Sequence, residues 1–242
     1  MSGSGKDTER PSRRGFLLGA AGGLAAATVA GGARAATPSP APTAPPETPA
    51  DTVSFWGTNQ AGIVTPQQSQ SYFAAFDLAA KNRAEVEALL RRWTAAAARL
   101  ANGETAASLD LDRDKPDADS GEALGLKASR LTLTFGFGPG LFVKDGKDRY
   151  GLAAHRPEAL VDLPRFTGDQ LQPGRSGGDL SIQACADDPQ IAFHAVRQLA
   201  RLAYGDAEIR WAQAGFAAEP GAKGTPRNLM GFKDGTGNPV TT

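Results

Sequence analysis

The sequence predicts an α+β fold, in which an antiparallel sheet carries its helices on one face. Two segments, residues 83–102 and 189–204, have apolar residues at helical spacing, and each lies between segments with the composition or the alternation of β-strands. The resulting order of strand, helix, strand, strand, helix and strand is complete by about residue 217. This order is that of the ferredoxin-like split βαβ motif.

The first half of the motif begins with residues 72–80 (YFAAFDLAA), a short apolar and aromatic run that predicts a strand. Asn82, followed three positions later by Glu85, is close to a capping box, so a helix is expected to begin at Arg83. Gly103 is expected to end this helix. Its apolar positions recur at helical spacing: Val86, Leu89, Leu90, Trp93, Ala97 and Leu100.

The middle of the chain contains a second strand between two loops. Residues 104–128 are polar and loop-like, whereas residues 130–137 alternate leucine and phenylalanine with threonine and glycine, which predicts a strand. A stretch rich in glycine and proline, residues 138–179, then precedes the next strand. A connection of about forty residues is usually functional or packed as a unit of its own.

The second half of the motif begins with a strand over residues 180–186 (LSIQACA). Asp188 and Pro189 open a helix, with proline at its first position, and Gly205 ends it. The apolar positions of this helix are Ile191, Phe193, Val196, Leu199, Ala200 and Leu202. Residues 207–217 form the last strand, around Ile209, Trp211 and Phe216.

The first 35 residues have the order of a signal peptide: a polar start, an apolar run rich in alanine and glycine, and a small-x-small cleavage site at residues 33–35. Arg13 and Arg14 directly before Gly-Phe-Leu are typical of the twin-arginine type. We expect export through the twin-arginine translocase to the periplasm, the cell envelope or the medium, with residues 36–52 as a linker rich in proline and alanine. The alternative is a disordered or amphipathic tail with a chance Arg-Arg pair.

The composition excludes several classes of protein. Lys plus Arg and Asp plus Glu are 26 each, so the formal net charge is zero, which argues against a nucleic-acid binder and against a polybasic membrane-surface protein. Cys185 is the single cysteine, so an internal disulfide is excluded. Because His155 and His194 are the two histidines of the chain, a multi-histidine metal site is not expected. Cys185 is expected to be a buried thiol, and Trp56, Trp93 and Trp211 are expected to pack in the core or on the sheet.

The densest candidate site is the loop around Asp234, in which Gly231, Gly235 and Gly237 allow close approach of a ligand to the backbone. An aspartate in such a loop can act as a general base or as a metal ligand. The alternative is a surface turn, because Asp-Gly is a common turn pair. A calcium loop is disfavoured because its Asp-x-Asp-x-Asp-Gly spacing is absent, and the chain carries no phosphate-binding or dinucleotide-binding glycine motif.

Four stretches, behind the twin-arginine signal, resemble the dye-decolorizing peroxidase family of haem peroxidases, and in particular its twin-arginine-exported deferrochelatase/peroxidase branch. They are residues 55–63 (FWGTNQAGI), 131–142 (LTLTFGFGPGLF), 176–194 (SGGDLSIQACADDPQIAFH) and 227–238 (RNLMGFKDGTGN). The last contains the family's G-x-x-D-G signature, which ends in Asp234 and Gly235. The family fold consists of two ferredoxin-like units, with haem in the second.

The resemblance implies a site. Residues 53–220 would be the N-terminal peroxidase domain, and residues 221–242 the start of the similar C-terminal domain that binds haem b. Asp234 would take a proton from one oxygen of hydrogen peroxide and deliver it to the other, because aspartate stays a base in acid, where histidine would be protonated. Gly235, Thr236 and Gly237 would lie against the haem.

The sequence departs from the family in one respect. The family's chain continues past this loop and there carries the proximal histidine and the distal arginine, and neither stretch occurs before Thr242. His155 and His194 lie in neither context, so both are predicted to be structural and no residue of this chain is assigned as a metal ligand. A haem-ligand role for His194, in the middle of its helix, is the alternative. The chain is expected to be the amino-terminal part of such an enzyme, as a fragment or a natural truncation.

The resemblance implies an exported haem peroxidase that oxidises bulky phenols or dyes with hydrogen peroxide. One alternative is a haem- or iron-handling component, a deferrochelatase, that acts with iron-uptake proteins of the envelope. The other is a non-catalytic domain, because the proximal ligand is absent from this chain. Hydrogen peroxide and an organic reductant are the expected small-molecule partners, homo-oligomers are expected, and nucleic acid is not.

Overall fold

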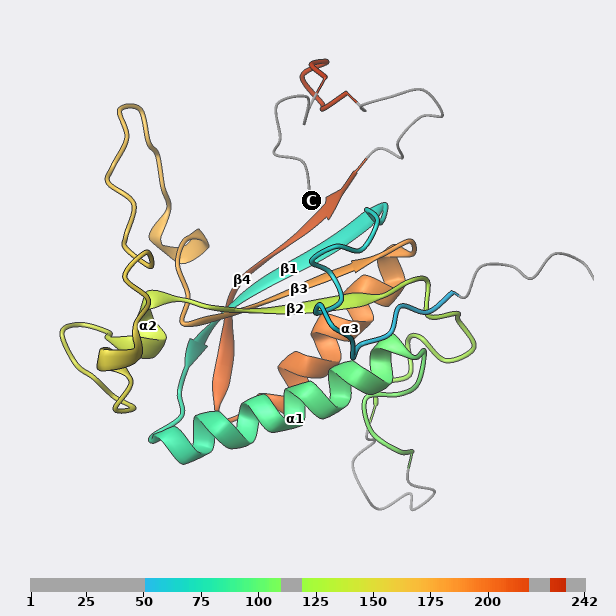
Figure 1. Cartoon of the computed structure of the whole chain (residues 1–242), viewed down its shortest axis with the longest axis horizontal. Helices are drawn as coiled ribbons and strands as arrows, with labels where there is room; N and C mark the ends of the chain where they lie inside the picture. Colours follow the sequence, from blue (N-terminus) through green and yellow to red (C-terminus); the bar gives the residue numbers. More distant parts are fainter. Residues whose placement is uncertain (1–50, 110–118, 218–226, 234–242) are drawn as a thin grey trace, which may run out of the picture. The chain divides into compact units, whose positions relative to one another are not determined.

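The computed structural model describes residues 51–109, 119–217 and 227–233 (Figure 1). The predicted signal peptide, residues 1–35, and residues 36–50 of the linker lie outside this part of the chain. None of the helices in the described ranges is long and apolar enough to cross a membrane.

Four strands form one antiparallel sheet in the order β2-β3-β1-β4. The strands are β1 (Gln70–Leu78), β2 (Thr132–Phe137), β3 (Leu180–Ala186) and β4 (Ala207–Phe216). Helix α1 connects β1 to β2, and helix α3 connects β3 to β4, so each βαβ unit crosses over one intervening strand. This is the predicted ferredoxin-like split βαβ arrangement, and the α+β class is confirmed.

Local capping determines where the two long helices begin. Helix α1 (Arg83–Ala101) starts after Asn82, whose Oδ1 accepts the backbone N–H of Glu85 at 3.1 Å, while the Glu85 carboxylate accepts the N–H of Lys81 at 2.6 Å. Helix α3 (Pro189–Leu202) starts after Asp188, whose Oδ1 accepts the N–H of Gln190 at 2.7 Å. Both N-termini are where the sequence predicts them, because each depends on a side chain only a few residues away.

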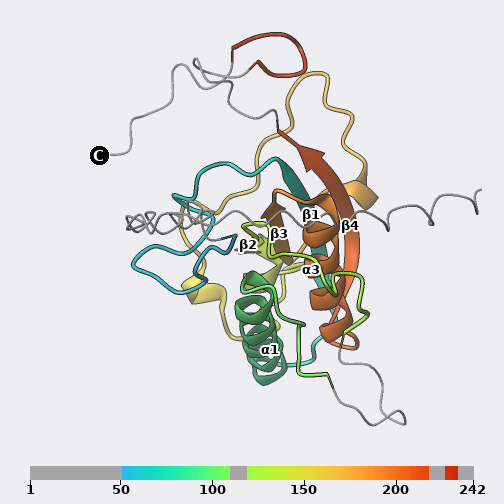
Figure 2. The same ribbon diagram turned by 90° about the vertical axis from the view of Figure 1, so that its right-hand side faces the viewer.

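The core lies between the sheet and the two helices, which cover the same face (Figures 1 and 2). Trp93 of α1 is central: its ring contacts Phe76 of β1 at a centroid distance of 5.2 Å and stacks on Phe135 of β2 at 5.7 Å. Its indole N–H donates to the carbonyl of Leu199 in α3 at 2.8 Å. One side chain thus joins both helices to two strands, and the predicted core role of Trp93 is confirmed.

The long connection between β2 and β3 contains three short helical segments: α2 (Pro139–Phe142), η1 (Ala153–His155) and η2 (Pro173–Arg175). Asp179, just before β3, fastens its first part to the sheet. The Asp179 carboxylate accepts hydrogen bonds from Lys144, Arg149 and the backbone N–H of Leu78, each at 2.9 Å. This connection is therefore partly packed as a unit, as its length predicts.

The structure corrects three sequence predictions. Strand β1 runs two residues earlier than predicted at both ends, because the N–H groups of Ala79 and Ala80 already donate to the Asp206 carbonyl, at 2.8 and 2.9 Å. Cys185 is half-buried rather than buried, because it lies beside Gln183 on the sheet face opposite the helices. Trp56 is 68% exposed and is not a core residue. Trp211 stacks on Phe73 at 5.2 Å, as a sheet-packing residue would.

Candidate functional site

The four residues predicted to form the site, Asp234, Gly235, Thr236 and Gly237, lie outside the described residues. The turn that leads into them is described. Arg227 and Lys233 pair as an antiparallel bridge. The side-chain oxygen of Asn228 accepts the N–H groups of Met230 and Phe232, at 3.0 and 3.1 Å.

Two further features close this turn. The Arg227 guanidinium donates to the carbonyl of Gly231 at 2.7 Å, and Gly231 has a φ of +85°, which favours glycine. The turn is therefore held by its own hydrogen bonds, up to the residue before Asp234. Leu229, Met230 and Phe232 lie exposed on it.

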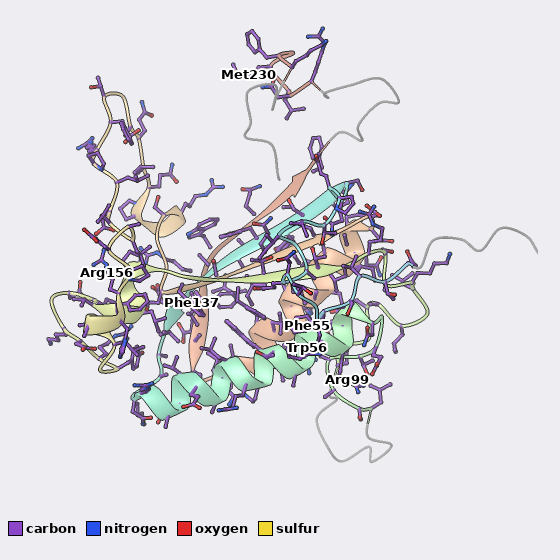
Figure 3. The ribbon with its side chains drawn as sticks, in the orientation of Figure 1. Phe55, Trp56, Arg99, Phe137, Arg156 and Met230 are labelled. Atoms are coloured by element: carbon purple, nitrogen blue, oxygen red, sulfur yellow. The ribbon has the colours of Figure 1, made fainter. Side chains whose placement is uncertain are left out.

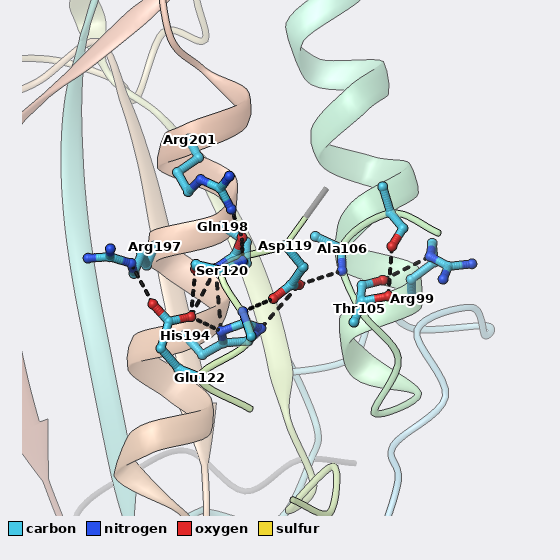
Figure 4. Close-up of polar contacts among 12 residues, drawn as sticks. Arg99, Thr105, Ala106, Asp119, Ser120, Glu122, His194, Arg197, Gln198 and Arg201 are labelled. Carbon is cyan, nitrogen blue, oxygen red and sulfur yellow. Dashed lines mark hydrogen bonds and ion pairs between the residues drawn. The ribbon is translucent and has the colours of Figure 1, made fainter. Parts of the chain in front are cut away.

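His194 is the more buried of the two histidines, with a side chain only 4% exposed. Its Nδ1 lies 2.8 Å from Oε2 of Glu122, and its Nε2 lies 3.3 Å from Oδ2 of Asp119 (Figure 4). A haem ligand needs a ring nitrogen that can point its lone pair at the iron. Both ring nitrogens of His194 face carboxylates instead, which supports the predicted structural role over the haem-ligand alternative.

His155 ends the short segment η1 in the long connection and is exposed. It lines none of the cavities found in the described residues at Asp119, at Phe55 or at Leu163. His194 has both ring nitrogens facing carboxylates and His155 lines none of these cavities, so the described residues place neither histidine as an axial haem ligand.

The contacts of His194 belong to a larger polar cluster between α3 and residues 119–122 (Figure 4). Arg197 donates to Oε1 of Glu122 at 2.6 Å, and Ser120 donates to Oε2 of the same carboxylate at 2.6 Å. Gln198 contacts the Ser120 hydroxyl and also accepts its backbone N–H at 3.3 Å. Side chains of α3 thus fasten this segment along one side of the helix.

The contacts in this polar cluster strongly favour the ionised form of the Glu122 side chain. Burial opposes ionisation, but hydrogen bonds from Ser120 and from a backbone N–H, with the hydrogen bond and charge of His194, outweigh it and lower the pKa of Glu122 to about 2. Glu122 is therefore a carboxylate throughout the neutral range.

Asp119 is the more deeply buried carboxylate of the cluster, with a fully buried side chain. Its Oδ1 accepts the N–H of Gly121 at 2.8 Å, and its Oδ2 accepts the N–H of Ala106 at 2.9 Å. Neither Asp119 nor Glu122 is identified by the sequence, because both lie in a polar loop some 70 positions from His194 and follow no known spacing motif. The one feature of the sequence that points toward this cluster is a histidine on the apolar side of a predicted helix.

Aromatic side chains line a hollow beside strand β2. Phe55 and Trp56 contact each other edge to face, with ring centroids 4.8 Å apart (Figure 3). Together with Phe135 and Phe137 of β2 they line a hollow of about 360 Å³. Phe55 and Trp56 belong to the stretch 55–63 that resembles the peroxidase family; Phe55 is half-buried against the core, whereas Trp56 is exposed.

Comparisons with known proteins cover the four strands and both long helices of the sheet domain. A family model for the N-terminal region of Dyp-type peroxidases matches residues 60–217, which include all four strands and both long helices. The deferrochelatase of Escherichia coli (strain K12) is 38% identical over 235 residues, covering 95% of this chain and 54% of the relative.

Solved structures of Dyp-type peroxidases also match this chain. A DyP-type peroxidase from Streptomyces coelicolor superposes with a TM-score of 0.68 at 44% identity, covering 79% of this chain and 49% of the other. Ferric DtpA from Streptomyces lividans gives a TM-score of 0.66 at 44% identity, covering 81% and 51%. The chain spans about half the length of these relatives. The match to sheet, helices and sequence together shows that the chain belongs to the Dyp-type peroxidase family.

Proposed function

We propose that this chain is part of a haem-dependent peroxidase that reduces hydrogen peroxide and oxidises bulky phenolic or dye-like compounds. The observation that supports this most is the 44% identity to a DyP-type peroxidase over 79% of this chain. In such a reaction, hydrogen peroxide takes two electrons from the organic reductant and two protons, and leaves as two waters.

In this proposal Asp234 moves the proton. It directly follows the hydrogen-bonded turn of residues 227–233 in the sequence, and Gly231, Gly235 and Gly237 around it would let a small ligand approach the backbone closely. A carboxyl group with an ordinary pKa of about 3.9 is a base at and below neutral pH. Asp234 would accept a proton from one peroxide oxygen and return it to the other, so that water leaves.

The substitution Asp234→Asn tests this role, because asparagine keeps the size but cannot accept the proton. In the haem-loaded protein, reaction with hydrogen peroxide is expected to slow about 100- to 10,000-fold, with haem content unchanged. Stopped-flow absorbance measures the rate, and Asp162→Asn, in the exposed connection, is the matched control. A rate within a factor of about three of the wild type would assign Asp234 to a surface turn instead.

The haem b itself would lie against Gly235, Thr236 and Gly237. The relative solved as ferric DtpA supports an iron cofactor in the family. Neither His194 nor His155 is placed as an axial haem ligand in the described residues, so neither is assigned that role. Hemin added to residues 36–242 is therefore expected to give no histidine-ligated Soret spectrum. A stoichiometric complex that is lost in His194→Gln or His155→Gln would contradict this assignment.

We also propose export of the folded protein by the twin-arginine pathway to the periplasm, cell envelope or medium. The Arg13-Arg14 pair before a weakly apolar run is the support. Replacing both arginines by lysine is expected to retain the protein in the cytoplasm, as cell fractionation would detect. Unchanged export of the double variant would rule out this route.

Release of iron from haem is the second candidate function, because the E. coli relative at 38% identity is named deferrochelatase. Iron-uptake proteins of the envelope would then be partners. Feeding haem and analysing the products separates the two functions: iron-free porphyrin indicates iron release, and oxidised dye with intact haem indicates a peroxidase. Assembly into homo-oligomers stays a prediction that light scattering on the purified protein can test.

A further inference from the structure

We propose that Asp119 and His194 bind a first-row divalent transition-metal ion, with Glu122 as the residue that positions the imidazole. These three side chains form a cluster in which one potential ligand atom from each lies within 4.8 Å of the others. The cluster joins helix α3 to residues 119–122.

The first reason is charge. A neutral imidazole carries one N–H. Nδ1 lies 2.8 Å from Oε2 of Glu122 and 3.4 Å from the amide nitrogen of Gln198, and the contact with Glu122 is the shortest that the ring makes, so we take Nδ1 as the donor. The lone pair of Nε2 then faces Oδ2 of Asp119 at 3.3 Å. Two lone pairs facing each other in a buried site repel, so a cation has to lie between them. The cation is either the second proton of a charged imidazolium or a metal ion that displaces this proton.

The second reason is the arrangement of His194. Histidines that bind metals usually donate their other ring N–H to a carboxylate, which fixes the tautomer and the ring orientation. Glu122 is placed for this role, and its own carboxylate is held by Ser120 and Arg197. The hydrogen bonds that hold the Glu122 carboxylate in place therefore also orient the His194 ring, with Nε2 toward Asp119.

The third reason is distance and space. Two ligand atoms 3.3 Å apart, each about 2.1 Å from one ion, subtend an angle of roughly 100–110° at that ion, close to tetrahedral. Oδ2 of Asp119 has one backbone donor, Ala106, and so keeps a lone pair for the ion.

A cavity of about 60 Å³ borders both Asp119 and His194. One water needs about 10–15 Å³ of such space, so the cavity has room for the water ligands that would complete the coordination.

The donor set determines the class of metal. One imidazole nitrogen with one carboxylate oxygen and waters suits zinc, iron(II) or manganese(II) better than calcium or magnesium, which prefer oxygen ligands alone. The ion would neutralise the buried Asp119 carboxylate and hold residues 119–128 against α3.

The test is a titration of the chelator-treated, tag-free 242-residue chain with zinc(II), followed by calorimetry and thermal unfolding. We expect one zinc ion per chain and a rise in Tm on binding. Asp119→Asn and His194→Gln should abolish binding, and Glu122→Gln should weaken it about 10- to 100-fold, as loss of a positioning partner does. His155→Gln, which changes the other histidine, is the matched control and should bind as the wild type does.

Two outcomes would overturn the proposal. The first is binding that is lost in His155→Gln and kept in His194→Gln. The second is no stoichiometric binding by the folded wild type, together with ¹⁵N resonances showing both nitrogens of the His194 ring protonated at neutral pH, since a proton then holds the site. If His194→Gln does not fold, the zinc titrations of the wild type and of Glu122→Gln still test the proposal, because Glu122→Gln keeps both proposed ligands.

Discussion

Asp179 and Asp119 are both buried carboxylates, 2% and 4% exposed, yet the molecule neutralises them differently. Asp179 contacts two side chains that are cationic at any physiological pH, Lys144 and Arg149, each at 2.9 Å. Asp119 contacts His194 at 3.3 Å and two backbone N–H groups. The first site has a permanent counter-charge, whereas the second depends on a proton or a metal ion at one imidazole.

The two carboxylates also connect different elements of the fold. Asp179 ties the long connection to the end of β1 and adjoins an ion-pair network in which Lys144 also contacts Asp77 at 2.9 Å. Lys144 and Arg149 thus supply two cationic side chains to Asp179. Asp119 ties a loop segment to α3 through His194 instead. The following experiments test whether the two sites really differ in this way.

The largest expected effect is at Asp179. Asp179→Ala leaves Lys144 and Arg149 without their buried partner and the N–H of Leu78 without its acceptor. Removal of one member of a buried ion pair typically costs about 3–5 kcal/mol. Urea unfolding should show this loss, whereas Asp77→Ala, at a carboxylate that is 36% exposed, should cost under about 1 kcal/mol. Equal losses in both variants would show that Asp179 does not anchor the connection.

Gly140 provides a smaller and sharper test of the same anchor. A Cβ at this position would lie 2.0 Å from Oδ1 of Asp179, so Gly140→Ala must displace the carboxylate. Overpacking of this kind costs about 1–3 kcal/mol. Gly174→Ala is the control, because a Cβ there meets nothing within 4 Å and its backbone needs no left-handed conformation. The prediction fails if both variants unfold at the same urea concentration.

A third test concerns the pH dependence at Glu122. Its pKa in the folded protein is about 2, below the ordinary value of 4.5. A lowered pKa adds stability that is complete above 4.5 and is lost as the pH falls toward 2. Glu122→Gln should therefore unfold with a shallower pH dependence in this window than the wild type. Glu158→Gln, at an exposed position, should keep the wild-type slope, and a wild-type slope in Glu122→Gln would contradict the proposed ionisation.

The parts of this fold that the sequence predicts well are those that depend on near neighbours in the chain. Asn82 and Asp188 cap helices through N–H groups two or three residues away, and β3 alternates so clearly that its bounds agree with the prediction. Trp93 was placed in the core because it shares the helical spacing of its apolar neighbours. These features need no knowledge of which distant segments meet.

The parts that the sequence does not predict depend on contacts across the chain. Nothing in the polar loop of residues 104–128 signals that Asp119 meets His194, because the pairing forms only when α3 packs beside that loop. The alternation of β3 groups Cys185 with Gln183 but does not by itself determine which face the helices cover. Trp56 precedes the first strand, where no periodicity indicates burial. The prediction for Asp234 and its flanking glycines stays a prediction.

The most direct test of the contrast between the two carboxylates is urea unfolding of the chelator-treated chain, with and without zinc(II), at neutral pH. The account predicts that zinc raises the unfolding midpoint of the wild type and of Asp179→Asn, and leaves that of Asp119→Asn unchanged. Stabilisation of Asp119→Asn equal to that of the wild type, or no stabilisation of the wild type, would contradict it.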